Sequence, residues 1–137
     1  MESSNVAQND ITRMLKVALA ILGVVQLAYG IGFLLIPGLV LTISGAPIPE
    51  YGWLRWSGGI LLALAYGTFR VFRNPAKQDV YVATMALAGL LNAVGLLISL
   101  IAGEFTGATW FIVLPMVLTF ALAVFLWLSR QRAKAVL

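Results

Sequence analysis

Few side chains in this sequence could take part in chemistry. The chain has no histidine and no cysteine, which excludes a histidine base, a thiol nucleophile and metal sites built on these ligands. An enzyme would have to use Arg55, Glu50, Glu104 or Tyr66, and no acid lies within an apolar stretch. We therefore predict a protein that is not an enzyme, with no catalytic residue, no metal and no cofactor.

Arg55 is the one basic residue that membrane topology does not account for, and two interpretations of it stay open. The first is an ion pair with Glu50 or Glu104, since an arginine near the membrane–water interface needs no function to be tolerated. The second is an outward-opening recess, loosened by Pro37 and Pro115, that binds a lipid phosphate or a quinone oxygen. The aromatic residues expected at this level are Tyr51, Trp53, Trp56 and Trp110.

Three uncharged polar residues lie near the middle of apolar stretches. They are Gln26, Asn92 and Thr119. One interpretation is a layer of hydrogen bonds between helices, each worth about 0.6 kcal/mol and at most about 1.7 kcal/mol. The other is a polar site for a ligand or a permeant species.

Four apolar stretches must position these residues. The chain of 137 residues is 61% hydrophobic and 10% charged, whereas soluble domains are roughly 45–50% apolar and about 25% charged. The stretches are Val17–Ile36, Trp53–Phe72, Val80–Ala102 and Ala108–Ser129. Each is long enough, at about 1.5 Å per residue, to cross a hydrocarbon core of about 30 Å. They predict an all-α membrane protein whose single domain, residues 1–137, is an up-down bundle of four transmembrane helices.

The basic residues predict the orientation of this bundle. Eight of the nine lie on one side of a four-span topology: Arg13, Lys16, Arg70, Arg73, Lys77, Arg130, Arg132 and Lys134. By the positive-inside rule both termini are cytoplasmic, in a bacterial inner membrane. These charges favour anionic lipid headgroups as partners and argue against nucleic acid. Residues 1–11 form a polar tail, and Thr12 is a candidate cap for the first helix.

Small residues mark the expected contact faces, because helices in lipid pack through them. The first helix offers Gly23 and Gly30, and the third offers Ala86, Gly89 and Ala93, with Asn92, Gly95 and Ser99 on the same side. In the second helix, Arg55, Gly59, Ala63 and Gly67 follow one another at intervals of four residues. This spacing predicts that Arg55 points inward with the glycines.

The Pro37-Gly38 pair predicts the end of the first helix, followed by a short interfacial segment over Leu39–Ser44. An arginine then opens a glycine-rich second helix, Arg55-Trp-Ser-Gly-Gly-Ile-Leu-Leu-Ala-Leu-Ala-Tyr-Gly67. Over residues 36–67 this layout resembles the small four-helix DoxX-like bacterial membrane proteins and related families of unknown function. The resemblance implies a compact four-helix bundle and an association with a quinone-linked redox complex, and it carries over no catalytic residue.

The functional hypothesis that follows is an accessory or assembly subunit of a larger membrane complex, with a protein partner or a second copy of itself. The alternative is a small-molecule, lipid or quinone binder or transporter. Its ligand-binding residues would be Arg55, Glu50, Tyr51, Trp56, Glu104 and Trp110.

Overall fold

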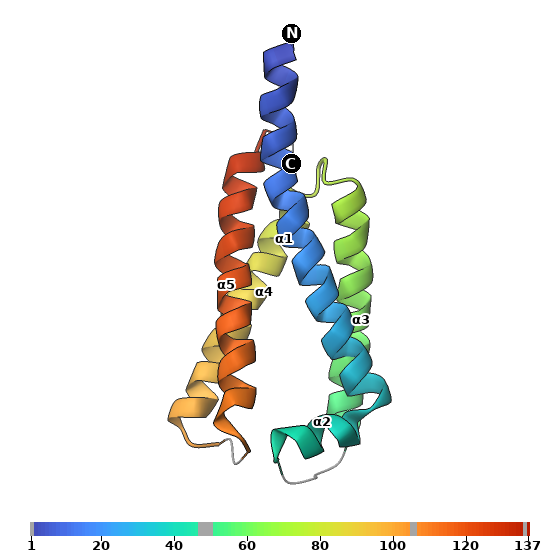
Figure 1. The fold of residues 1–137 in the computed structure, drawn as a ribbon, viewed down its shortest axis with the longest axis vertical. Helices are drawn as coiled ribbons and strands as arrows, with labels where there is room; N and C mark the ends of the chain where they lie inside the picture. The colour runs from blue at the N-terminus through green and yellow to red at the C-terminus, as the bar shows by residue number, and fades with distance from the viewer. Residues whose placement is uncertain (1, 47–50, 105–106, 136) are drawn as a thin grey trace.

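The chain is all-helical over the residues that its computed structural model describes. These are residues 2–46, 51–104, 107–135 and 137, with side chains described from residue 12 onward. The five helices are α1 (Glu2–Leu35), α2 (Pro37–Ser44), α3 (Gly52–Arg73), α4 (Asp79–Ile101) and α5 (Thr109–Ala133) (Figure 1). The predicted all-α class is confirmed for this part of the chain.

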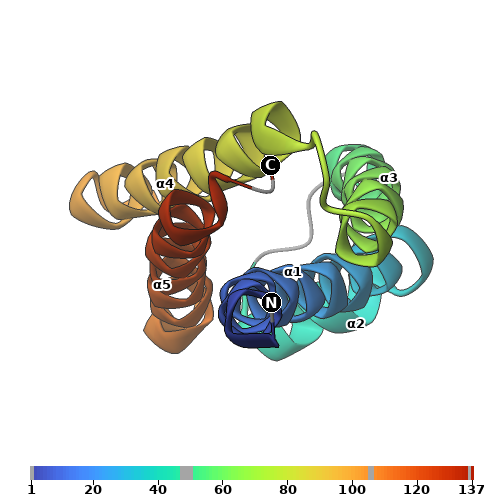
Figure 2. The same ribbon diagram turned by 90° about the horizontal axis from the view of Figure 1, so that it is seen from above.

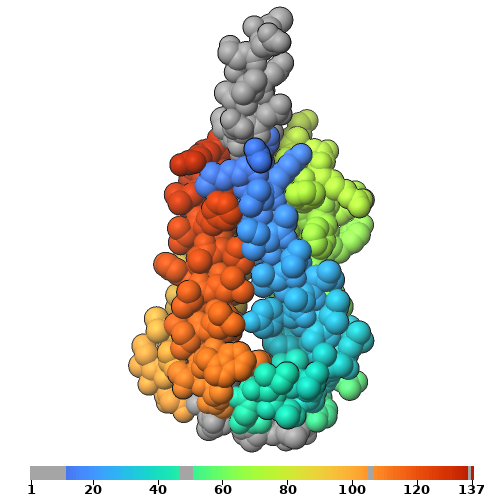
Figure 3. Space-filling view, in the orientation of Figure 1, coloured from blue at the N-terminus to red at the C-terminus, as the bar shows by residue number. Residues whose placement is uncertain are grey.

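The long helices form two antiparallel pairs. α1 packs along α3, α4 packs along α5, and α1 also contacts α5, which joins the pairs (Figure 2). Both termini lie at one end of the molecule, together with the α3–α4 connection, and α2 lies at the other (Figure 1). The pairs diverge toward α2, where Figure 3 shows an opening between α5 and α1.

Three helical segments are long and apolar enough to cross a membrane. They are Thr12–Leu35, Asp79–Ile101 and Thr109–Ala133. α3 has a similar length of 22 residues, but Arg55, Arg70 and Arg73 lower its mean hydropathy. The chain is therefore a membrane-type helical protein with three apolar candidate spans.

The first helix begins earlier than the sequence analysis predicted. α1 starts at Glu2, so Thr12 lies inside the helix and is not its cap. No proline or glycine occurs among the first eleven residues, so nothing in the backbone chemistry stops the helix there. The other predicted helix bounds agree with the structure within four residues.

Pro37 divides α1 from α2. A proline restricts the residue before it to non-helical conformations, and Ile36 has φ −129° and ψ 46°. Pro37 then begins α2, where its missing N–H costs nothing. Gly45 ends this helix with a left-handed φ of 67°. The segment predicted as a turn over Leu39–Ser44 is thus a two-turn helix.

The core lies where the two helix pairs converge, toward the termini. Its buried apolar residues come from all four long helices and include Leu15, Leu19, Val71, Val82, Met85 and Leu126. These contacts hold the α3–α4 connection against α1 and α5, and so they position the pocket described below.

α3 meets α1 through a different face from the predicted one. A Cβ built at Gly58 would lie 2.6 Å from the backbone nitrogen of Leu34 and 2.9 Å from the carbonyl oxygen of Gly30. Gly59 and Ala63 are exposed, and a Cβ at Gly59 would meet nothing within 4 Å. Because Gly58 and Gly59 are adjacent, a one-residue displacement of the contact face turns the helix by about 100°.

Most of the small residues predicted on the other helices lie at helix contacts, but Gly95 is exposed, with nothing within 4 Å of its Cβ position, and Asn92 is exposed beside it. A Cβ at Gly23 would lie 2.9 Å from the Phe69 ring, and one at Gly30 would lie 2.8 Å from the Leu62 side chain. Ala86 and Ala93 are buried, and a Cβ at Gly89 would lie 3.1 Å from Ala123.

Candidate functional site

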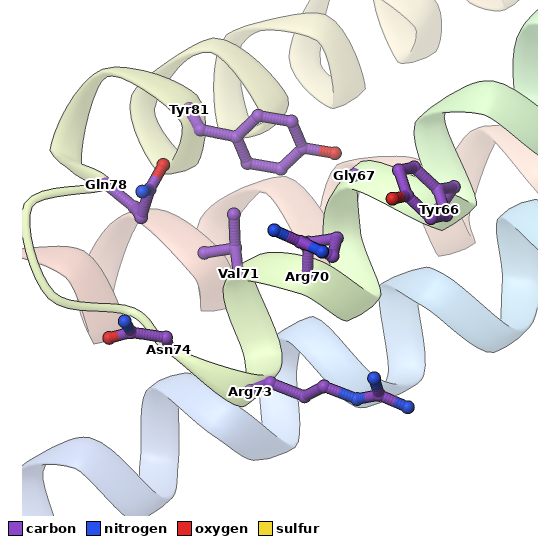
Figure 4. A pocket seen from close by; sticks show the side chains of 8 residues that line it. All are labelled: Tyr66, Gly67, Arg70, Val71, Arg73, Asn74, Gln78 and Tyr81. Carbon is purple, nitrogen blue, oxygen red and sulfur yellow. The ribbon is translucent and has the colours of Figure 1, made fainter.

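An open pocket lies between the end of α3 and the start of α4, at the end of the molecule that carries both termini. Its volume is about 490 Å³. The lining residues are Tyr66, Gly67, Arg70, Val71, Arg73, Asn74, Gln78 and Tyr81 (Figure 4). The sequence analysis did not identify this site.

A tight connection brings the two walls of the pocket together. α3 ends where Asn74 adopts φ −140° and its N–H donates to the Arg70 carbonyl, at 3.2 Å. The N–H of Gln78 donates to the Pro75 carbonyl, also at 3.2 Å, and closes the turn. The chain reverses its direction at Lys77, which has a left-handed φ of 61°. As a result, the first turn of α4 faces the last turns of α3.

Tyr81 crosses from α4 to α3 and forms one wall. Its hydroxyl donates to the Leu64 carbonyl at 2.9 Å, and its ring lies over the backbone at Gly67 (Figure 4). A Cβ at Gly67 would lie only 2.7 Å from the Tyr81 hydroxyl oxygen. A glycine is therefore required here for the tyrosine to reach α3.

A buried polar cluster adjoins the pocket behind Tyr81. The Thr68 hydroxyl lies 2.8 Å from Gln26 Oε1 and 3.0 Å from the Tyr81 hydroxyl. Gln26 Nε2 in turn lies 3.7 Å from the sulfur of Met85. The Thr68 hydroxyl donates to Gln26 Oε1 and the Tyr81 hydroxyl donates to the Leu64 carbonyl. Each hydroxyl has only one proton, so the contact between the two hydroxyls can form only when one of them turns from its other acceptor. The cluster links α1, α3 and α4 and fixes the inner wall.

The charge of the pocket comes from Arg70 and Arg73. Both side chains are exposed, and neither forms an ion pair with a residue that the structure describes. Figure 4 shows Arg70 in the space below the Tyr81 ring, whereas Arg73 extends away from it. The last turn of a helix favours such cations, so their position is compatible with the α3 dipole as well as with a ligand.

This arrangement suits an anion. Guanidinium groups bind phosphate and carboxylate oxygens through paired N–H donors, and Asn74, Gln78 and Tyr66 add uncharged polar groups around them. No group of three or more acidic, histidine or cysteine side chains that could hold a metal ion occurs among the described residues.

The residues predicted to line a recess lie at the opposite end of the molecule from this pocket, and those that the structure describes are exposed. Arg55 is exposed, and Trp56 and Trp110 expose 70% and 54% of their surface. Arg55 makes no ion pair with Glu104, which is exposed. At 100° per residue Arg55 lies about 60° round α3 from Gly58, beside the contact face, and its side chain is exposed. Glu50, its other predicted partner, lies outside the described residues.

Tyr51, the remaining member of the predicted recess, is exposed, and its hydroxyl lies near Gly38, whose Cβ would be 3.3 Å away. Trp110 instead packs edge-on against Phe111, with ring centroids 5.4 Å apart. These aromatic side chains therefore make local contacts at their own helix ends.

The three polar residues predicted to form one layer are not brought together. Gln26 is buried in the cluster at Thr68, whereas Asn92 is exposed on α4. The Thr119 hydroxyl donates within its own helix, to the carbonyls of Pro115 at 2.8 Å and Met116 at 3.2 Å. Pro115 has no N–H and so leaves the Phe111 carbonyl without its helical donor, but the Thr119 hydroxyl bonds to other carbonyls of the same helix.

The residues that the sequence analysis missed carried a weak signal. Thr68 and Tyr81 are ordinary helix residues, and the polar run Arg73-Asn74 is also what a cytoplasmic loop requires. Only the short α3–α4 connection and the reach of the Tyr81 side chain to α3 give them a common site. Comparisons with protein-family models, curated proteins and solved structures gave no match.

Proposed function

We propose that this chain is a four-span membrane protein that binds an anionic headgroup in the pocket between α3 and α4. The observation that supports this proposal is the pair of arginines, Arg70 and Arg73, which line an open pocket of about 490 Å³ without an acidic partner among the described residues. The Arg70 guanidinium lies in the pocket and Arg73 adds positive charge at its edge, and such charges favour a negatively charged ligand.

The packing of α3 supports a fourth span. α3 contacts α1 from Gly58, near Leu34, to Phe69, near Gly23. It therefore extends over the same depth as α1, which is one of the three apolar candidate spans. Because α3 runs antiparallel to α1 along this span, we expect α3 to cross the membrane beside α1.

The charge distribution supports an orientation with both termini in the cytoplasm. The eight basic residues named above belong to the end of the molecule that carries the termini, and Arg55 belongs to the other end. The positive-inside rule assigns the basic end to the cytoplasm, and a bacterial inner membrane remains the predicted location.

A lipid phosphate is the ligand that this position favours. The pocket lies where α3 ends and the apolar span of α4 begins, which is the level of the headgroups on the basic side. Arginines near an anionic leaflet contribute about 1 kcal/mol each to binding. The anionic-lipid site thus replaces the predicted site around Arg55.

Thermal unfolding in neutral detergent tests this function, with phosphatidylglycerol or phosphatidylcholine added. A ligand that binds the native state raises Tm, so phosphatidylglycerol should stabilise the protein more than phosphatidylcholine does. The double variant Arg70→Gln/Arg73→Gln should bind phosphatidylglycerol about thirtyfold more weakly, since two contacts of about 1 kcal/mol are lost.

Arg132→Gln is the matched control, because Arg132 is an exposed arginine at the same end but does not line the pocket. This variant should keep the phosphatidylglycerol effect. An equal loss in the control would show that general surface charge, and not the pocket, produces the stabilisation by phosphatidylglycerol. Equal stabilisation by soluble glycerol phosphate would assign the pocket to a free anion and not to a lipid.

The role as an accessory or assembly subunit stays a prediction, as does the link to a quinone-dependent redox complex through the DoxX-like resemblance. Neither depends on the pocket, since a subunit of a larger complex can also hold a structural lipid.

A further inference from the structure

The pocket between α3 and α4 combines positive charge with uncharged polar groups. Among the described residues that line it, none is an aspartate or a glutamate. Asp79, which follows Gln78 in the sequence, has both carboxylate oxygens bonded to Arg130, at 2.7 Å each. An ammonium group on a ligand would therefore lie beside Arg70 without a counter-charge, and such an unpaired charge acts against binding. The pocket thus disfavours headgroups that carry an ammonium group.

The pocket has room for more than a phosphate group. Its volume of about 490 Å³ lies in the range of small-molecule sites, about 300–1,000 Å³. Arg70 accounts for the phosphate, so the remaining polar groups are available to the part of the ligand that is attached to it.

Gln78 brings an unbonded amide into this space. Its backbone N–H closes the turn at Pro75, whereas its side chain is exposed and bonds to no other residue that the structure describes. Figure 4 shows this amide beside the Tyr81 ring, with Arg70 below the same ring. A side-chain amide has two N–H donors and an acceptor oxygen. It can therefore bind a hydroxyl group as donor or acceptor, next to a phosphate held by Arg70.

We propose that the pocket selects a polyol phosphate headgroup, such as that of phosphatidylglycerol, and that Gln78 is the residue that recognises its hydroxyl groups. This inference rests on the proposed function, because it names the class of anionic lipid that the pocket binds. The amide carries no charge, so it distinguishes headgroups by their hydroxyl groups without adding to the attraction for phosphate.

Two anionic lipids that differ in hydroxyl groups alone test this inference. Phosphatidylglycerol is compared with phosphatidylpropanol, whose headgroup has the same length and charge but no hydroxyl group. The rise in Tm of the full chain in neutral detergent is titrated with each lipid. Phosphatidylglycerol should bind about fivefold more tightly, the usual gain from one hydrogen bond between neutral groups. Phosphatidylethanolamine should give the smallest rise.

The variant Gln78→Met tests the role of the amide. Its side chain has a similar length but neither the N–H donors nor the acceptor oxygen, so the two anionic lipids should bind equally. The affinity for phosphatidylpropanol should stay unchanged, whereas a purely structural defect would lower the affinity for both lipids. Gln131→Met is the matched control, because Gln131 is exposed near the end of α5 and does not line the pocket. This control should keep the fivefold preference.

Equal affinity of the unsubstituted chain for phosphatidylglycerol and phosphatidylpropanol would overturn the inference and leave the proposed anionic-lipid site intact. A preference that persists in Gln78→Met would also overturn it. If neither lipid stabilised the chain more than phosphatidylcholine does, the proposed function itself would fail. Soluble glycerol phosphate is titrated as well, and stabilisation equal to that by phosphatidylglycerol would overturn a lipid as the source of the polyol phosphate.

Discussion

At Gly58 the backbones of α3 and α1 approach closely enough to exclude a side chain. The carbonyl of Gly30 and the N–H of Leu34 fill the space that a Cβ would need. Backbone atoms cannot move aside as the end of a flexible side chain can. This close approach therefore fixes which face of α3 meets α1.

Gly58→Ala should lower the free energy of unfolding by about 1–3 kcal/mol, the usual cost of forcing an extra methyl group into a packed contact. Gly59→Ala is the matched control, because its Cβ meets nothing within 4 Å. Removing a helical glycine there should be neutral or stabilise by up to about 1 kcal/mol. Denaturant titration in detergent micelles measures both, and equal losses would contradict the observed contact face.

At the scale of helices, α4 and α5 are joined by a paired ionic contact. Arg130 donates to both carboxylate oxygens of Asp79, each at 2.7 Å, and its guanidinium lies 4.9 Å from the centre of the Trp127 ring. The Arg130 side chain is 13% exposed and that of Asp79 is 40% exposed. The contact fixes the first turn of α4, from which Tyr81 extends to the pocket.

Asp79→Asn should lower the free energy of unfolding slightly, because it removes the carboxylate that Arg130 binds through two N–H groups and because exposed ion pairs contribute little. Arg130→Gln should have a similar effect, and the double variant should cost less than the sum, because both remove one contact. Glu104→Gln provides the control, since this exposed acid makes no ion pair among the described residues. Strict additivity of the two variants would show that the contact contributes nothing in the membrane.

At the scale of the whole molecule, the two helix pairs place the termini and the α3–α4 connection at one end. The pocket and the basic residues therefore share that end, whereas α2, Arg55 and Gly103 belong to the other. The proposed orientation therefore decides which lipids can reach the proposed site. With the basic end in the cytoplasm, the pocket opens to lipids of the cytoplasmic leaflet.

Topology reporters should place both termini and residue Lys77 on the cytoplasmic side, and Gly103 on the opposite side. Single cysteines at Lys77 and Gly103, tested with a membrane-impermeant thiol reagent in intact cells, give the same information without a fusion. Gly103→Cys should be labelled and Lys77→Cys should not. Labelling of both or the reverse pattern would exclude the proposed orientation.

The sequence by itself determined the class of the protein and most helix bounds. Hydrophobic stretches of about 20 residues and a proline–glycine break are local properties, so they need no tertiary information. The contact residues of α1 and α4, such as Gly23 and Ala86, could also be predicted, because each helix has one set of small residues at helical spacing.

Only the tertiary structure decided which face of α3 turns inward and which polar residues meet. Gly58 and Gly59 satisfy the same spacing rule, and lipid supplies no hydrophobic force that separates an inward face from an outward one. Asn92 and Gln26 look alike in sequence, yet one is exposed and the other is bonded to Thr68. The pocket depends on Tyr81 of α4 reaching Gly67 of α3. A local sequence pattern cannot predict this contact, because it joins two different helices.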